Sequence, residues 1–168
     1  MKSKSITLLL MMVSPCWGAD QAAMTLDGSV VADSCQLTAG GDGQRVALGE
    51  LTLEQVRTGT LGDWKALSLN FEHCSGTVTF DITHQGSVDT DNPQLLAAQG
   101  SGKGVGIELQ AQPADSGVYD PVTLNSLQNG WHLTGNKALN YRVRLHPNGA
   151  AASVGNVVGN LAIQITWR

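Results

Sequence analysis

The chain has 168 residues, of which 42% are hydrophobic and 14% are charged, and its formal net charge is −4. This size and composition fit one globular domain with enough apolar side chains to build a core. The acidic balance and the lack of a basic cluster in the sequence argue against a nucleic-acid-binding protein and against attachment to membranes through polybasic residues.

The first predicted element is a secretory signal peptide over residues 1–18. A basic start precedes an apolar run, Ile6–Val13, that is too short to span a bilayer as a helix. Cleavage after Gly18 is preferred to cleavage after Ala19, because it places a small residue, and not Trp17, at the third position before the cut.

Removal of the signal leaves two cysteines, Cys35 and Cys74, in an oxidising export pathway. We expect them to form a disulfide, which contributes roughly 4 kcal/mol in the chain-entropy model. The alternative, a metal site formed with His73, lacks the CxxC or HxxxH spacing that accompanies such sites. Lipid attachment at Cys16 is also open, although Pro15 directly before it suits that processing poorly.

Beyond the signal, short β-branched or alternating runs are separated by clusters of Gly, Asn, Asp and Pro. No long run has helical spacing, so the pattern predicts an all-β fold with at most one helical turn, over Leu53–Arg57. Two segments, Gln85–Gly104 and Gln112–Asn129, are rich in loops. The predicted strands are Met24–Ala32, Gln44–Leu51, Ala66–Phe71, Thr77–Thr83, Val105–Gln110, Gly130–Leu133, Leu139–Leu145 and Val157–Trp167.

Short strands at this spacing with one disulfide indicate a β-sandwich of immunoglobulin type. Antibody-type domains also carry a tryptophan between their cysteines, and Trp64 has that place in the sequence. Because Trp64 follows Gly62 and Asp63, we expect it in a loop and not in a core strand.

The last fourteen residues, Gly155–Arg168, have the clearest strand pattern. From Gly159 on, odd positions carry Gly, Leu, Ile, Ile and Trp, while the even positions are mostly polar, which predicts a half-buried strand. No return strand, helix or charged run follows in the sequence, so its far edge is expected to pair with an earlier strand or with another chain.

The segment before Cys35 alternates in the same way. Ala22, Met24 and Leu26 would face one side, with Gly28 next in the row. A chain with an alternating strand at each end can polymerise head to tail, because the front strand of one copy can fill the edge of the next in a contact that does not close. The alternative is that both are ordinary core strands of one monomer.

These features resemble the pilin subunits of chaperone–usher fimbriae of Gram-negative bacteria, especially the type 1 branch. The resemblance covers essentially the whole mature chain. It is most specific at the end, where Gly155 is the fourteenth residue from the C-terminus and the penultimate Trp167 replaces the commoner tyrosine; Arg168 is an unusual last residue. Its other marks are Leu26–Val31 before Cys35, Val46–Leu51, Leu69–Cys74 and Val105–Leu109.

The resemblance implies an incomplete immunoglobulin-like sandwich that lacks its final strand and is completed by donor-strand complementation. A periplasmic chaperone lends a strand and anchors the terminal carboxylate, and at the outer-membrane usher the N-terminal extension of another subunit replaces it. The implied divisions are a signal peptide (1–18), a donor extension (19–27) and a pilin domain (28–168). The implied donor residues are Ala22, Met24, Leu26 and Gly28, and the implied chaperone-binding and acceptor residues are Gly155, Val157, Gly159, Leu161, Ile163, Ile165, Trp167 and Arg168.

Catalytic patterns are weak throughout. Ser153 lacks the first glycine of GxSxG, Gly100–Gly106 lacks the Walker residues, and Asp89–Asn92 begins like a calcium loop that Pro93 ends. We therefore expect no enzyme activity, metal or cofactor. Four histidines without metal-ligand spacing are expected in loops or on the surface: His73, His84, His132 and His146.

The sequence thus predicts a non-catalytic fimbrial subunit that is exported through the periplasm to the cell surface and supports adhesion. Its expected partners are a periplasmic chaperone, an outer-membrane usher and neighbouring subunits. The alternatives are a secreted or periplasmic immunoglobulin-like adhesive module that binds a ligand through its loop-rich segments, and a periplasmic enzyme or inhibitor on a complete sandwich. A major rod subunit and a minor tip or adaptor subunit fit the pattern equally.

Overall fold

The computed structural model describes residues 35–39, 43–113 and 117–168. In this part of the chain nearly all regular structure is strand, and the single helix is α1 (Leu53–Arg57). The all-β class and the helical turn are therefore confirmed. The predicted signal peptide, the donor extension and the strand Met24–Ala32 lie outside the described residues. Within these ranges no helix has the length and apolar character needed to cross a membrane.

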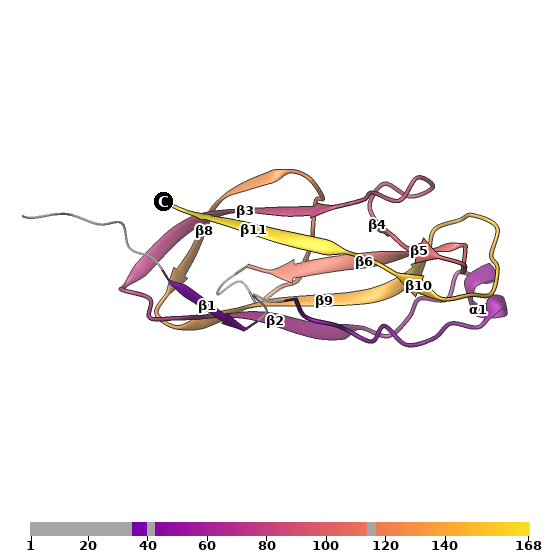
Figure 1. The fold of residues 1–168 in the computed structure, drawn as a ribbon, viewed down its shortest axis with the longest axis horizontal. Coiled ribbons are helices and arrows are strands. Elements are labelled where there is room, and N and C mark those ends of the chain that lie inside the picture. Colours follow the sequence, from indigo (N-terminus) through magenta and orange to yellow (C-terminus); the bar gives the residue numbers. More distant parts are fainter. Residues whose placement is uncertain (1–34, 40–42, 114–116) are drawn as a thin grey trace, which may run out of the picture. The chain divides into compact units, whose positions relative to one another are not determined.

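The strands form two main antiparallel sheets and one small ribbon (Figure 1). The first sheet has the order β1 (Gln36–Ala39), β2 (Lys65–Glu72), β9 (Lys137–Pro147), β6 (Val105–Gln112) and β4 (Leu96–Ala97), with β7 (Asp120–Pro121) paired to β6. The second has the order β11 (Leu161–Trp167), β3 (Thr77–Gly86) and β8 (Leu127–Thr134). The ribbon pairs β10 (Val157–Val158) with β5 (Gln99–Gly100).

The core lies between the two sheets. Phe71 of β2 and Phe80 of β3 have ring centroids 6.0 Å apart, and Tyr141 of β9 meets His84 of β3. Alternation explains these contacts, because every second side chain of a strand points to the same face. Apolar side chains of both sheets join one buried cluster, and the predicted immunoglobulin-like sandwich is confirmed.

The disulfide between Cys35 and Cys74 is confirmed, with the two Cα atoms 4.4 Å apart. Cys35 directly precedes β1 and Cys74 follows β2, so the bond fastens two neighbouring strands of one sheet. Because both thiols are used in this bond, the alternative metal site with His73 is wrong.

Two strand predictions were wrong. Residues 44–51 form no strand, although Val46, Leu48 and Leu51 pack partly buried against the core. The side-chain amide of Gln44 donates to the carbonyl of Ser68 in β2, so this segment follows the first sheet without entering its ladder. The predicted strand over 157–167 is interrupted and divides into β10 and β11, which belong to different sheets.

The remaining differences are smaller. β1 was not predicted, and the loop-rich segments contain the two-residue strands β4, β5 and β7. Trp64 lies outside the strands, immediately before β2, as expected. The prediction for His84 was wrong, because this residue lies within β3 and its side chain is fully buried.

Candidate functional site

The edge of β11 is the candidate site. β11 pairs with β3 from Leu161 opposite Gly86 to Trp167 opposite Phe80. Its other edge has no strand partner among the described residues, and Figure 1 shows it at the border of its sheet. An unpaired edge presents backbone N–H and C=O groups that another strand can bind.

Side chains of β11 alternate strictly between the core and the solvent. The even residues are exposed and the odd ones are only half-buried, although they pack against the core cluster. Trp167 makes edge-to-face contacts with Phe80 at 5.4 Å and with Phe71 at 5.8 Å, measured between ring centroids. We call the half-buried set the apolar row; its members are Leu161, Ile163, Ile165 and Trp167.

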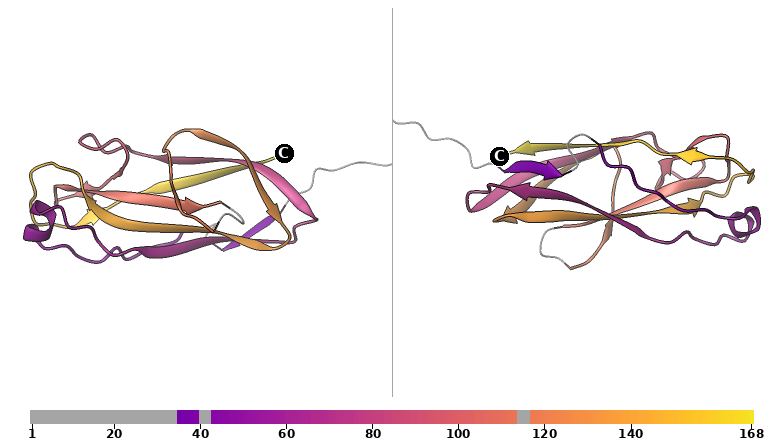
Figure 2. Two further views of the ribbon diagram at one scale, coloured as in Figure 1. Left: turned by 180° about the vertical axis from the view of Figure 1, so that it is seen from behind. Right: turned by 60° about the horizontal axis from the view of Figure 1, so that its bottom comes forward.

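A second set of half-buried side chains lies on the first sheet. Val46, Leu48 and Leu51 belong to the segment between β1 and α1, which the right view of Figure 2 shows as an irregular trace. The contact of Phe71 in β2 with Trp167 in β11 places these two strands across from each other in the sandwich. Val46, Leu48 and Leu51 thus remain partly uncovered, as the apolar row of β11 does.

Two glycines make close contacts on the approach to β11, and the one at Gly155 leaves no room for a side chain. A side chain at Gly155 would overlap the backbone of Ser101 and Gly102, and one at Gly159 would overlap the Ile107 side chain. These contacts carry the chain from the ribbon of β10 and β5 to the second sheet. Of the eight predicted acceptor residues, Gly155, Val157 and Gly159 therefore lie before β11 and not in it.

Arg168 fastens the end of β11 to the rest of its sheet. Its backbone N–H donates to the carbonyl of Thr79 at 2.9 Å, and its Nε donates to Oδ2 of Asp81 at 2.7 Å. The other Asp81 oxygen accepts from the backbone N–H of Gly130 in β8. The hydrogen bond from Arg168 holds the pKa of the Asp81 carboxyl below its usual value. Sequence reasoning missed Asp81, although a carboxylate in the middle of an apolar strand indicates a bonded partner.

His84 and Tyr141 form a polar contact inside the core. Nε2 of His84 lies 3.0 Å from the Tyr141 hydroxyl oxygen, and the pair connects β3 to β9. Burial lowers the pKa of His84 to about 4 and raises the pKa of Tyr141 well above its usual value. The imidazole is therefore neutral at physiological pH, and the pair is part of the core that supports β11.

Asp89, which begins the calcium-like part of the sequence, already has structural partners. The Asp89 carboxylate accepts from the backbone N–H groups of Asp91 and Asn92 and from the side chain of Asn148. In the described ranges no group of three His, Cys, Asp or Glu side chains could hold a metal ion.

A hollow of about 350 Å³ opens away from β11, between the β8 edge and the β6–β7 pair. Its lining combines apolar residues with amide, imidazole and carboxylate groups, and part of it comes from the loop-rich segment Gln112–Asn129. The lining residues include Ala111, Asp120, Val122, Gln128, Trp131 and His132.

Three solved structures have a similar fold. A chain from the structure of a chaperone–usher pilus superposes with a TM-score of 0.65 at 19% identity, covering 92% of this chain and 100% of its own length. The P pilus rod subunit PapA gives 0.62 at 20% identity, covering 80% of this chain and 99% of its own. The CupB6 tip adhesin from Pseudomonas aeruginosa gives 0.52 at 17% identity, over 82% of this chain and 44% of its own.

At these identities the structures show a shared fold and no more. No curated protein matches the chain. A family model described as fimbrial protein matches residues 24–168. That match spans most of the sequence, and the chain therefore belongs to the fimbrial protein family.

Proposed function

We propose that this chain is a non-catalytic structural subunit of a chaperone–usher fimbria and that it polymerises by donor-strand exchange. The observation that carries the proposal is the apolar row of β11, which is half-buried on a strand with one free edge. A strand added at this edge would pair with the backbone of β11 and place its own side chains over the row. Strand addition would thus pair the free backbone groups of β11 and bury the apolar row at the same time.

The proposed donor is the N-terminal extension, residues 19–27, of a neighbouring copy, with Gly28 continuing its row. Ala22, Met24 and Leu26 have the two-residue period that such a strand needs. Ala22 is small for a donor side chain, which fits a shallow contact at its place in the row. The remaining residues, 28–168, would form the pilin domain after removal of a signal peptide, residues 1–18.

Before assembly, a periplasmic chaperone would cover the same edge with a strand of its own. The apolar row, from Leu161 to Trp167, would supply the apolar contacts with the chaperone strand. The bound strand of this chain would end at Arg168. An outer-membrane usher would then exchange the chaperone for the donor of the next subunit and deliver the growing fimbria to the cell surface. There the fimbria would support adhesion.

Co-expression with a cognate periplasmic chaperone tests this function. The full chain should copurify with the chaperone, and the purified complex should form polymers over time. Deletion of Asp20–Leu26 should preserve chaperone binding and abolish polymers, because the deleted chain keeps its acceptor edge and loses its donor. A stable, monodisperse monomer produced without any chaperone would contradict the proposal.

A pair of point variants makes the same test sharper. Leu26→Arg places a charge among the donor residues, whereas Thr25→Arg places it on the opposite face of the same strand. We expect polymers to be lost with Leu26→Arg and retained with Thr25→Arg, with equal chaperone binding in both. Equal polymer formation by the two variants would show that this row is not the donor.

A second candidate function is ligand binding at the hollow beside β8. Trp131 offers an aromatic surface there, and Gln128 has a buried side-chain oxygen without a hydrogen-bond partner in the described part of the chain. If this hollow binds a ligand that mediates adhesion, Trp131→Ala should reduce adhesion of fimbriated cells and leave polymer length unchanged. Unchanged adhesion would remove this candidate.

A further inference from the structure

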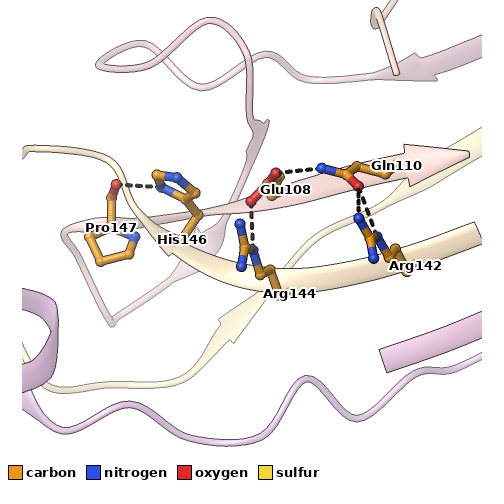
Figure 3. Close-up of polar contacts among 6 residues, drawn as sticks. All are labelled: Glu108, Gln110, Arg142, Arg144, His146 and Pro147. Atoms are coloured by element: carbon orange, nitrogen blue, oxygen red, sulfur yellow. Dashed lines mark hydrogen bonds and ion pairs between the residues drawn. The ribbon is translucent and has the colours of Figure 1, made fainter. Parts of the chain in front are cut away.

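The outer face of the β6–β9 pair carries a second ordered set of side chains, far from the apolar core. Two cross-strand pairs, Gln110 with Arg142 and Glu108 with Arg144, lie directly opposite each other in the ladder. Figure 3 shows their side chains joined into one chain of contacts. This face lies on the opposite side of the sheet from the buried residues Ile107 and Leu109.

Two aromatic rings hold the guanidinium groups in place. The Trp64 ring centroid lies 4.1 Å from the Arg144 guanidinium carbon and 4.3 Å from that of Arg142. Tyr119 lies 4.5 Å from Arg142 on the same measure. We call these six residues the arginine ladder: Trp64, Glu108, Gln110, Tyr119, Arg142 and Arg144. Arginine, tryptophan and tyrosine are also enriched among the few residues that contribute most to binding at protein–protein interfaces.

The two arginines differ in how their charge is balanced. Arg144 pairs with the Glu108 carboxylate through Nε at 2.6 Å. Arg142 donates from Nε and Nη2 to the side-chain oxygen of Gln110, which is neutral. Among the described residues no carboxylate pairs with Arg142, so the ladder has two cations and one anion. A guanidinium has five N–H donors, and the contacts with Gln110 leave some of them for another acceptor.

We propose that the arginine ladder is a docking surface for an exposed carboxylate of a second copy of this chain, with Arg142 as its anchor. This inference rests on the proposed function, because polymerisation holds copies close together and raises their effective concentration. Charge complementarity favours the same partner, since the chain as a whole carries a net charge of −4 while the ladder has an excess of positive charge. The guanidinium is already ordered by two rings and an amide, so it loses little freedom on binding.

Zero-length cross-linking tests the contact. Arg142→Lys retains the charge and introduces an amine that carbodiimide couples only to a carboxylate in direct contact. Chain–chaperone complexes of this variant, one preparation isotopically light and one heavy, are mixed and allowed to polymerise before coupling. We expect mixed light–heavy peptides that join position 142 to an aspartate or glutamate of another copy, and these peptides should be lost when coupling is done in high salt.

Arg144→Lys is the matched control on the same face. Its amine should couple within one copy to Glu108, which gives no mixed peptides and shows that the reaction works at this site. Arg57→Lys, at an exposed position in α1, measures random contacts. The same reaction on wild-type polymers measures the mixed peptides that the native lysines form.

The outcomes separate this contact from the function on which it rests. Normal polymers in which position 142 couples only to Glu108 of its own copy, or to nothing, would overturn the docking surface and leave donor-strand exchange intact. A wild-type chain that binds a chaperone and never polymerises would overturn both.

Discussion

β9 and β11 have the same alternating pattern in the sequence and differ in their surroundings. β9 lies between β2 and β6, and its inward residues Leu139, Tyr141 and Leu145 are 0%, 0% and 4% exposed. β11 has one neighbour in the described structure, and its inward residues remain half-buried. Alternation thus determines which side chains turn inward, whereas the neighbouring strands determine how completely those side chains are covered.

The difference also indicates where a partner strand would gain most. Covering apolar surface contributes roughly 25 cal/mol per Å² removed from water. β9 has little apolar surface left to cover, whereas every residue of the apolar row still exposes some. Substitutions in the two strands should therefore differ in their cost and in their response to an added strand.

Leu139→Ala in β9 should lower the free energy of unfolding by about 2–5 kcal/mol, because it leaves a cavity at a site without access to solvent. Urea unfolding of the variant that lacks Asp20–Leu26, separated from its chaperone and refolded, measures this loss with and without a peptide of residues 19–30. The loss should be equal in both conditions. A loss that changes with the peptide would mean that β9 also responds to the added strand.

Because His84 is buried in the core between the two sheets, we expect the free energy of unfolding to depend on pH. The pKa of His84 is about 4 in the folded chain and 6.5 without burial, so between these values the unfolded chain binds more protons. The free energy of unfolding should therefore fall as the pH drops from about 6.5 to 4, by at most about 3 kcal/mol. The urea midpoint measured across this range checks the slope. His84→Gln should flatten this slope, whereas His132→Gln, at an exposed position, should leave it unchanged.

Ile163→Ala in β11 should cost about 1–2 kcal/mol in the free chain, which is less than Leu139→Ala because the side chain is already partly in water. With the peptide of residues 19–30 bound, the cost should rise toward that of a buried site. The same pair of urea titrations measures the change. Gln164→Ala, on the exposed face, serves as the control and should have no effect in either condition. An equal cost with and without the peptide would contradict strand addition over this row.

Arg168→Gln should have the smallest effect on the folded chain, since its side chain is 59% exposed. We expect a slight loss of stability above the pKa of Asp81, because this carboxylate loses its charged partner, and no loss below it. Hydrogen exchange at the last residues of β11 would report local fraying. Arg168→Lys should restore part of the protection, and unchanged exchange in Arg168→Gln would show that the ion pair does not hold the strand end.

Much of this architecture follows from local patterns. The strands of the central pairs were predicted within a few residues, since β-branched alternation and turn residues are local signals. The disulfide was predictable because only two cysteines lie outside the predicted signal peptide. The errors arose where local pattern and tertiary environment disagree. Residues 44–51 alternate like a strand, yet only a side-chain bond from Gln44 ties this segment to β2, and its backbone joins no ladder.

The candidate site was predicted in part. Alternation alone identified the inward residues of β11 from Leu161 to Trp167. It missed the interruption at Gly159, a residue that packs closely against Ile107, which is distant in the sequence. It also missed Asp81 as the partner of Arg168 and the burial of His84. Each of these depends on a residue that a linear pattern cannot bring near.

The all-β class, the disulfide and the inward face of each main strand could be read from the sequence, because these depend on period, residue type and count. Which alternating strand has neighbours on both edges, and which has one free edge among the described residues, depends on the fold. The fold also decided that Arg142 meets a neutral amide while Arg144 meets a carboxylate. The physical reason is the same in both cases: hydrogen-bond ladders, burial and charge pairing are made between residues that the fold, and not the chain order, brings together.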